Sequence, residues 1–269
     1  MTVLVTGATG NIGRLVVDHL ITLGAGDIRA LTANPAKAAL PESVTAITGY
    51  LGKPETLPAA FEGVDRVYLA PFPATVGPTL ELMAQAGVQY VVALSGGAHW
   101  TDHADAVAAS GLAHTQLGPG EFCENFAMWA PQIKTGTVRD VAPDYVESPV
   151  SMDDIARVAA HLLAAPQDAH LGAMYELTGP VALSRADIAV QIGAGLGTPV
   201  DVQRCSRAEA EELLRPVMGD GAQWYLDLFD GEPEPQAAND NVERLTGTPA
   251  ESMAQWATRN RALFSWPPA

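Results

Sequence analysis

Three glycines near the amino terminus, Gly7, Gly10 and Gly13, have a spacing found in loops that bind phosphate groups. They lie between the apolar run at residues 2–6 and the amphipathic stretch at residues 12–23. The first glycine allows a tight turn, the second lets an anion approach the backbone, and the third lets a helix pack close to a sheet. Amide groups at the start of that helix would bind a pyrophosphate.

The sequence therefore predicts a dinucleotide site in this loop. Its expected binding residues are Gly7, Thr9, Gly10, Asn11, Ile12, Gly13 and Arg14. The alternative interpretation is a loop whose glycines only form a turn.

The choice between NAD and NADP is usually made about twenty residues after the loop, at the end of the second strand. An acid at that point binds the ribose hydroxyls of NAD, whereas an arginine accommodates the phosphate of NADP. This chain has Ala33 and Asn34 there, and the nearest cations are Arg14 and Lys37. The sequence thus predicts NADP or NAD as cofactor and leaves the preference open.

Four more residues are expected to contact the cofactor because they lie at or just after the ends of strands. Tyr50 would stack on the adenine, or alternatively cover the edge of the sheet. Pro71 and Phe72 would pass along the cofactor in an extended path. Ser95 would lie beside the nicotinamide, or alternatively cap the end of its strand.

Ser95, His103 and Glu121 are the candidates for proton transfer. We expect His103 and His99 in a loop beyond the fifth strand, at the edge where open α/β sheets bind ligands. His103 would donate a proton there; the alternative is that the loop is only solvated and has no catalytic role. Glu121 would point into a cleft, or alternatively place its carboxylate at a helix N-terminus. No third ligand accompanies the two histidines, so no metal site is predicted.

The elements that must position these residues follow from the alternation of apolar runs and amphipathic stretches, which is typical of βαβ units. Strands are expected at residues 2–6, 28–32, 44–48, 66–70, 89–95, 112–117, 145–150 and 174–178. Helices are expected at 12–23, 79–86, 122–130 and 153–164, after the N-cap Ser184, and from Ser206 onward.

This order predicts an α/β protein with a Rossmann-type, doubly wound parallel sheet at residues 1–130. A smaller, mostly helical lobe is expected to follow at residues 131–269, with the segment 145–165 returning to the first domain. Trp129 is expected in a core, whereas for Trp100 and Trp224 the choice between core packing and a pocket for a flat ring system stays open.

The composition limits the partners. The chain has 269 residues, of which 15 are basic and 31 acidic, so its net charge is −16. Such a surface repels phosphate backbones and anionic lipids, so neither nucleic acid nor membrane is expected to bind. Cys123 and Cys205 are far apart and form no metal or redox motif, which favours a cytoplasmic protein.

Six segments of the chain resemble the NmrA-like family of atypical short-chain dehydrogenases/reductases, in the order in which that family has them. They are residues 5–14, 30–35, 60–65, 119–125, 153–156 with 175–180, and 242–247. The resemblance implies an NAD(P)-binding domain and a C-terminal lobe over the substrate. The chain departs from the family pattern at Ala33 and Gly118, where arginine is frequent, and at Tyr50, where aspartate is frequent.

The resemblance also implies a choice of functions, since the family is similar to a mixture of reductases and cofactor sensors. None of the six tyrosines is followed four residues later by lysine, so the Tyr-x-x-x-Lys proton donor is absent. We therefore expect an NAD(P)H-dependent oxidoreductase, a monomer or homodimer, that reduces a small conjugated carbonyl, enone or quinone. The alternatives are a non-catalytic redox sensor, and a cyclase or isomerase that uses His103 or Glu121.

Overall fold

The computed structural model describes residues 1–95, 101–165, 168–231 and 234–264. These residues form two compact units. Unit 1 comprises Met1–Pro119, Met152–Leu177 and Asn241–Thr248, and unit 2 comprises Gly120–Ser151, Thr178–Asp240 and Pro249–Ala269. Each unit is thus built from three separate segments of the chain.

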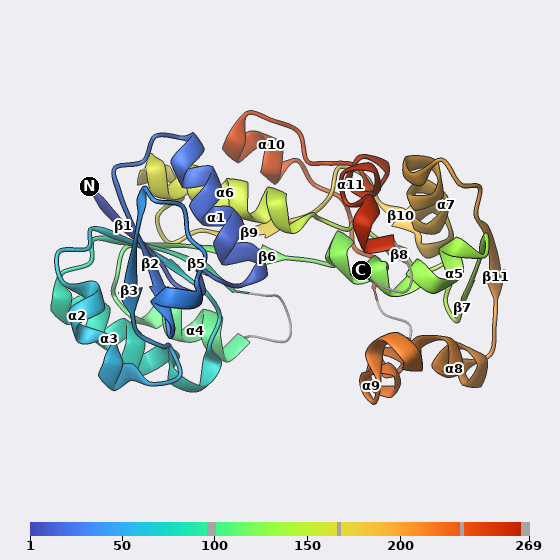
Figure 1. Ribbon diagram of the computed structural model, residues 1–269, viewed down its shortest axis with the longest axis horizontal. Helices are drawn as coiled ribbons and strands as arrows, with labels where there is room; N and C mark the ends of the chain where they lie inside the picture. Colours follow the sequence, from blue (N-terminus) through green and yellow to red (C-terminus); the bar gives the residue numbers. More distant parts are fainter. Residues whose placement is uncertain (96–100, 166–167, 232–233, 265–269) are drawn as a thin grey trace. The chain divides into compact units, whose positions relative to one another are not determined.

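A parallel sheet is the centre of unit 1 (Figure 1). In the described chain it has seven strands in the order β3-β2-β1-β4-β5-β6-β9. The strands are β1 (Thr2–Val5), β2 (Asp27–Thr32), β3 (Val44–Thr48), β4 (Arg66–Leu69), β5 (Tyr90–Leu94), β6 (His114–Pro119) and β9 (Met174–Leu177). The strand order reverses between β1 and β4, so their carboxyl ends meet at the switch point where such sheets bind ligands.

Helices cover both faces of this sheet (Figure 1). One face carries α1 (Asn11–Thr22) and α6 (Met152–Ala164), and the other carries α2 (Pro58–Phe61), α3 (Val76–Ala86) and α4 (Thr101–Ala109). The short helix α10 (Asn241–Thr246) packs against α6. Helix α1 is amphipathic, and its buried side carries Val16, Val17 and Leu20. The predicted Rossmann-type fold is therefore confirmed.

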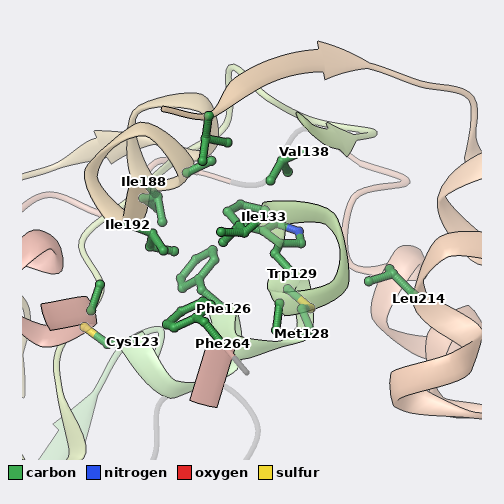
Figure 2. Close-up of a cluster of buried hydrophobic side chains, with 14 of the residues drawn as sticks. Cys123, Phe126, Met128, Trp129, Ile133, Val138, Ile188, Ile192, Leu214 and Phe264 are labelled. Carbon is green, nitrogen blue, oxygen red and sulfur yellow. The ribbon is translucent and has the colours of Figure 1, made fainter. Parts of the chain in front are cut away.

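Unit 2 is mainly helical. Its described elements are η4 (Cys123–Trp129), α5 (Ala130–Lys134), β7 (Thr137–Asp140), β8 (Val146–Glu147), β10 (Leu183–Ser184), α7 (Arg185–Leu196), β11 (Asp201–Arg204), α8 (Arg207–Met218), α9 (Gly221–Asp227), α11 (Met253–Arg259) and η6 (Arg261–Phe264). Ser184 caps α7 by accepting a hydrogen bond from the Asp187 amide, which confirms the predicted N-cap. In the core, Ile188 and Ile192 of α7 lie close to Phe126 of η4 (Figure 2).

Arg185 is buried in the core of unit 2. Its guanidinium donates two hydrogen bonds to the carboxylate of Asp140, at 3.1 and 2.8 Å, and one to Oε2 of Glu147, at 3.0 Å. Its Cζ atom lies 4.7–5.7 Å from the ring centroids of Phe126, Trp129, Tyr225 and Phe229. Buried charges require such partners, because an unpaired charge in a core would cost several kcal/mol.

Three predictions about elements were wrong. The segment 122–130 forms the 3₁₀-helix η4 instead of an α-helix, and of the strand expected at 145–150 only β8 (Val146–Glu147) is formed. His103 lies in the first turn of α4 and not in a loop. At these three places the local sequence only weakly favours one type of element over another. Packing against the rest of each unit therefore decides which element forms. In the described part of the chain, no helix is long and apolar enough to cross a membrane.

Candidate functional site

The glycine loop connects β1 to α1 in a conformation that depends on its glycines. Gly7 has a φ of +60°, which side chains disfavour, and a Cβ there would lie 2.9 Å from Cβ of Ala70. The Gly10 amide donates to the Gly7 carbonyl oxygen at 2.9 Å and closes the turn. A Cβ on Gly13 would lie only 2.2 Å from that same oxygen, so helix and loop touch at this point.

The first turn of α1 is suited to an anion. Gly10 is the N-cap, and no side chain forms a capping hydrogen bond there. The first turn also contains no acidic residue, so nothing neutralises the positive end of the helix. The amides that follow Gly10, starting with those of Asn11 and Ile12, therefore offer the donors that a pyrophosphate requires.

A pocket of about 310 Å³ lies beside this loop, at the carboxyl ends of the first strands. It is lined by Gly7, Thr9, Leu31, Thr32, Ala33, Gly49, Tyr50, Leu51, Ala70, Pro71 and Phe72. Six of these residues were predicted to bind the cofactor: Gly7, Thr9, Ala33, Tyr50, Pro71 and Phe72. The chain segments after β1, β2, β3 and β4 thus meet around one space that suits a nucleotide.

Sequence reasoning did not identify the other lining residues. Leu31 and Thr32 belong to the end of β2, and Gly49 directly follows β3, so their place at the carboxyl edge was the available signal. Gly49 permits close packing, since a Cβ there would lie 2.7 Å from Cδ1 of Leu31. Ala70 directly follows β4, so the same signal was available for it, whereas nothing in the local sequence marks Leu51.

Two aromatic rings form one wall of the pocket. The rings of Tyr50 and Phe72 meet edge to face, with centroids 5.6 Å apart and planes at 80°. Both rings pack over Gly52, where a Cβ would lie 2.6 Å from the Tyr50 ring and 2.9 Å from the Phe72 ring. Tyr50 remains 47% exposed, so a flat base can reach its ring.

The residues expected to discriminate between NAD and NADP lie at the rim of unit 1. Ala33 and Asn34 are exposed just after β2. Arg14 donates from Nη1 to the Ala39 carbonyl oxygen at 2.8 Å and lies 3.5 Å from the carboxylate of Asp18. Its charge is thus partly balanced by Asp18.

Ser95 and His103 form a buried pair in unit 1. Oγ of Ser95 lies 3.3 Å from Nδ1 of His103, and both side chains are fully buried. Burial lowers the pKa of His103, so the ring is neutral near pH 7. Its Nε2 has no hydrogen-bond partner among the described residues. Neither residue lines the nucleotide pocket, and His99 lies outside the described residues.

Glu121 lies in unit 2, two residues before the start of η4. Its Oε1 accepts a hydrogen bond from Nδ2 of Asn125 at 2.9 Å. Burial raises the pKa of Glu121, while the hydrogen bond from Asn125 and the charge of Arg185 oppose this effect. Glu121 is therefore suited to carry a proton at a higher pH than an exposed glutamate. Among the described residues, no three His, Cys, Asp or Glu side chains are placed to bind a metal ion.

The parallel sheet, the glycine loop and the pocket beside it define a Rossmann-type dinucleotide-binding protein. Comparison with known proteins agrees: residues 7–166 match a family model described as NAD(P)H-binding. The chain is 32% identical to an NAD(P)H azoreductase of Xenophilus azovorans, over 97% of this chain and 99% of that protein. The chain belongs to this NAD(P)H-binding family, in its NmrA-like branch of atypical short-chain dehydrogenases/reductases, and its cofactor is NADP or NAD.

Two further relatives cover nearly the whole chain. A (4-alkanoyl-5-oxo-2,5-dihydrofuran-3-yl)methyl phosphate reductase of Streptomyces griseus is 29% identical, over 98% of this chain and 99% of that protein. The crystal structure of an NADPH-dependent quinone oxidoreductase from Escherichia coli superposes with a TM-score of 0.82 at 25% identity, over 96% of this chain and 98% of that one. The likeness therefore extends over both units of the fold.

Proposed function

We propose that this chain is an NAD(P)H-dependent oxidoreductase that reduces a small conjugated carbonyl, enone or quinone. The observation that carries the proposal is the glycine loop, whose uncapped helix and adjacent pocket suit a dinucleotide. The relatives are named as reductases of an azo compound, of an unsaturated furanone and of a quinone. These acceptors are all conjugated.

In this proposal, different residues of the loop and the pocket bind different parts of the cofactor. The pyrophosphate lies against the amides of the loop, from Gly10 to Gly13. The adenine lies against the ring of Tyr50, beside Phe72, and the adenosine ribose near Ala33 and Asn34. Pro71 and Phe72 line the path of the bound molecule. The bound cofactor supplies a hydride, and the protein supplies orientation and protons.

We propose that Ser95 and His103 form a proton relay. If Nδ1 of the neutral ring carries the proton, it donates to Oγ of Ser95, and Nε2 is the unprotonated nitrogen without a described partner. Ser95 can then pass its hydroxyl proton to the acceptor and take the Nδ1 proton in return, while Nε2 takes up a proton and the ring stays neutral. Reduction of a conjugated acceptor requires this proton in addition to the hydride, and the chain has no Tyr-x-x-x-Lys pair to supply it. Glu121 is the second candidate donor.

The first experiment is calorimetric titration of the purified protein with NADH and NADPH separately. We expect one of them to bind, and then to be oxidised in the presence of a panel of quinones and enones. Two flat isotherms would overturn the dinucleotide site itself. Binding without oxidation of the cofactor by any acceptor would favour a redox sensor, a function consistent with Ala33 and with the absence of the Tyr-x-x-x-Lys pair.

A further inference from the structure

The loop between β2 and β3 is the part of unit 1 where the adenosine ribose of a dinucleotide is recognised. Ala33 and Asn34 begin this loop directly after β2; both are exposed, and Ala33 also lines the nucleotide pocket. NADPH differs from NADH by a phosphate on the 2′-oxygen of this ribose. That phosphate carries roughly two negative charges, so it needs nearby cations to bind well. The charges of this loop and of the adjoining helix α1 therefore set the preference between the two dinucleotides.

The pocket and the loop together carry no net charge. Among the described residues, the pocket lining contains no lysine, arginine, aspartate or glutamate. The loop at residues 33–43 contains one cation, Lys37, and one acid, Glu42, and both are exposed. An exposed lysine gains little from an ion pair, because water screens the charge and the long side chain loses freedom. Neither the pocket nor the loop thus supplies the cations that a 2′-phosphate needs.

Arg14 of α1 also reaches this loop, but its guanidinium already has two partners. Its Nη1 donates to the Ala39 carbonyl oxygen at 2.8 Å, and its Nε lies 3.5 Å from Oδ1 of Asp18. Ala39 has a φ of +47°, in the left-handed region that side chains disfavour, so the bond from Arg14 helps to hold the loop in this conformation. A phosphate that took Arg14 would break this bond and would lie close to the carboxylate of Asp18.

We infer that this chain binds NADH more tightly than NADPH. Asn34 is exposed at the ribose and can both donate hydrogen bonds to its hydroxyls and accept them, but it offers a phosphate no charge. The chain as a whole carries a net charge of −16, which repels NADPH more strongly than NADH. The residues that set the preference are Ala33, Asn34 and the pair Arg14–Asp18. The inference rests on the nucleotide site of unit 1 and is independent of the acceptor that the proposed function assigns.

The test is calorimetric titration of the whole protein with NADH and NADPH at two salt concentrations. At about 50 mM salt, the dissociation constant of NADPH should exceed that of NADH by about tenfold or more. At about 300 mM salt this ratio should become smaller, because salt screens the repulsion between the acidic protein and the extra phosphate. A site with cations for the phosphate would behave in the opposite way, since salt would then weaken NADPH more than NADH. Equal affinities, tighter binding of NADPH, or a ratio that grows with salt would overturn the inference.

Substitutions assign the preference to particular residues. Asp18→Asn removes the carboxylate beside Arg14 and should strengthen NADPH severalfold relative to NADH. Glu81→Gln, at an exposed residue of α3 outside the pocket lining, removes the same charge elsewhere in unit 1 and is the matched control, which should leave the ratio unchanged. Asn34→Ala should weaken NADH more than NADPH, because only NADH has a 2′-hydroxyl for this side chain to bind.

Arg14→Gln tests whether the arginine already binds phosphate in the wild-type protein. Because its guanidinium is engaged by Ala39 and Asp18, the ratio of the two dissociation constants should change by less than about threefold. A loss of about tenfold or more that affects NADPH alone would show that Arg14 is a phosphate ligand and would refute the assignment.

The outcomes separate this inference from the proposed function. If NADPH binds more tightly and is oxidised by a quinone or an enone, the oxidoreductase function stands and the preference for NADH fails. If NADH binds more tightly and no acceptor oxidises it, the preference stands and the oxidoreductase function fails. Two flat isotherms would overturn the nucleotide site on which both depend.

Discussion

The buried carboxyl group of Glu147 leads to a prediction about how stability depends on pH. Glu147 is 7% exposed and shares Arg185 with Asp140. Burial raises the pKa of Glu147 to about 7, because the attraction of Arg185 only partly offsets the loss of water and Glu121 and Asp140 add repulsion. Ionised Glu147 is thus less favourable in the folded protein than in the unfolded chain.

The direction in which stability changes with pH follows from the higher pKa of Glu147 in the folded protein than in the unfolded chain. Below about pH 4.5, the usual pKa of glutamate, Glu147 is protonated in both states and does not affect folding. As the pH rises from about 4.5 to about 7, the unfolded chain ionises first and the free energy of unfolding falls. At 1.36 kcal/mol per pKa unit, the full loss is about 3 kcal/mol above pH 7.

The assay is urea unfolding of wild type and Glu147→Gln, followed by tryptophan fluorescence at about pH 4 and about pH 8. Glutamine keeps an oxygen for Arg185 and cannot ionise. We expect similar stability of the two proteins at the lower pH, and an advantage of up to about 3 kcal/mol for the variant at the higher pH. Glu209→Gln, at a partly exposed residue of α8, is the control. A difference between wild type and Glu147→Gln that is the same at both pH values would refute the reasoning.

Three further predictions follow from other sites. Gly13→Ala places a Cβ against the Gly7 carbonyl oxygen and should lower the free energy of unfolding, measured by heat or urea, by about 1–3 kcal/mol. The control is Gly77→Ala in α3, where a Cβ meets no atom within 4 Å, and this substitution should be neutral or stabilising. Equal effects of the two substitutions would contradict this prediction. Tyr225→Phe removes a buried hydroxyl without a described partner, so stability should be unchanged or rise by up to about 1 kcal/mol, and a clear loss would show a hidden partner. Ala33→Arg should shift the ratio of calorimetric dissociation constants toward NADPH by about tenfold or more, and an unchanged ratio would place the ribose elsewhere.

Much of unit 1 could be predicted because its signals are local. A strand, a glycine turn and an amphipathic helix each depend on residues that are neighbours in the chain. Gly7 and Gly13 illustrate this, since one needs a positive φ and the other a close contact within the same loop. Tyr50, Pro71 and Phe72 could be predicted as pocket residues because strand ends meet at one edge of a parallel sheet.

The sequence by itself determined the parallel sheet, the glycine loop, the family and the class of cofactor. Tertiary structure alone decided that His103 is a buried partner of Ser95, that Arg185 faces Asp140 and Glu147, and that Trp224 lies in a groove. The reason is physical: these contacts join segments that are distant in the chain or whose local patterns are weak. Burial, charge pairing and pKa arise only when packing within each unit brings such segments together.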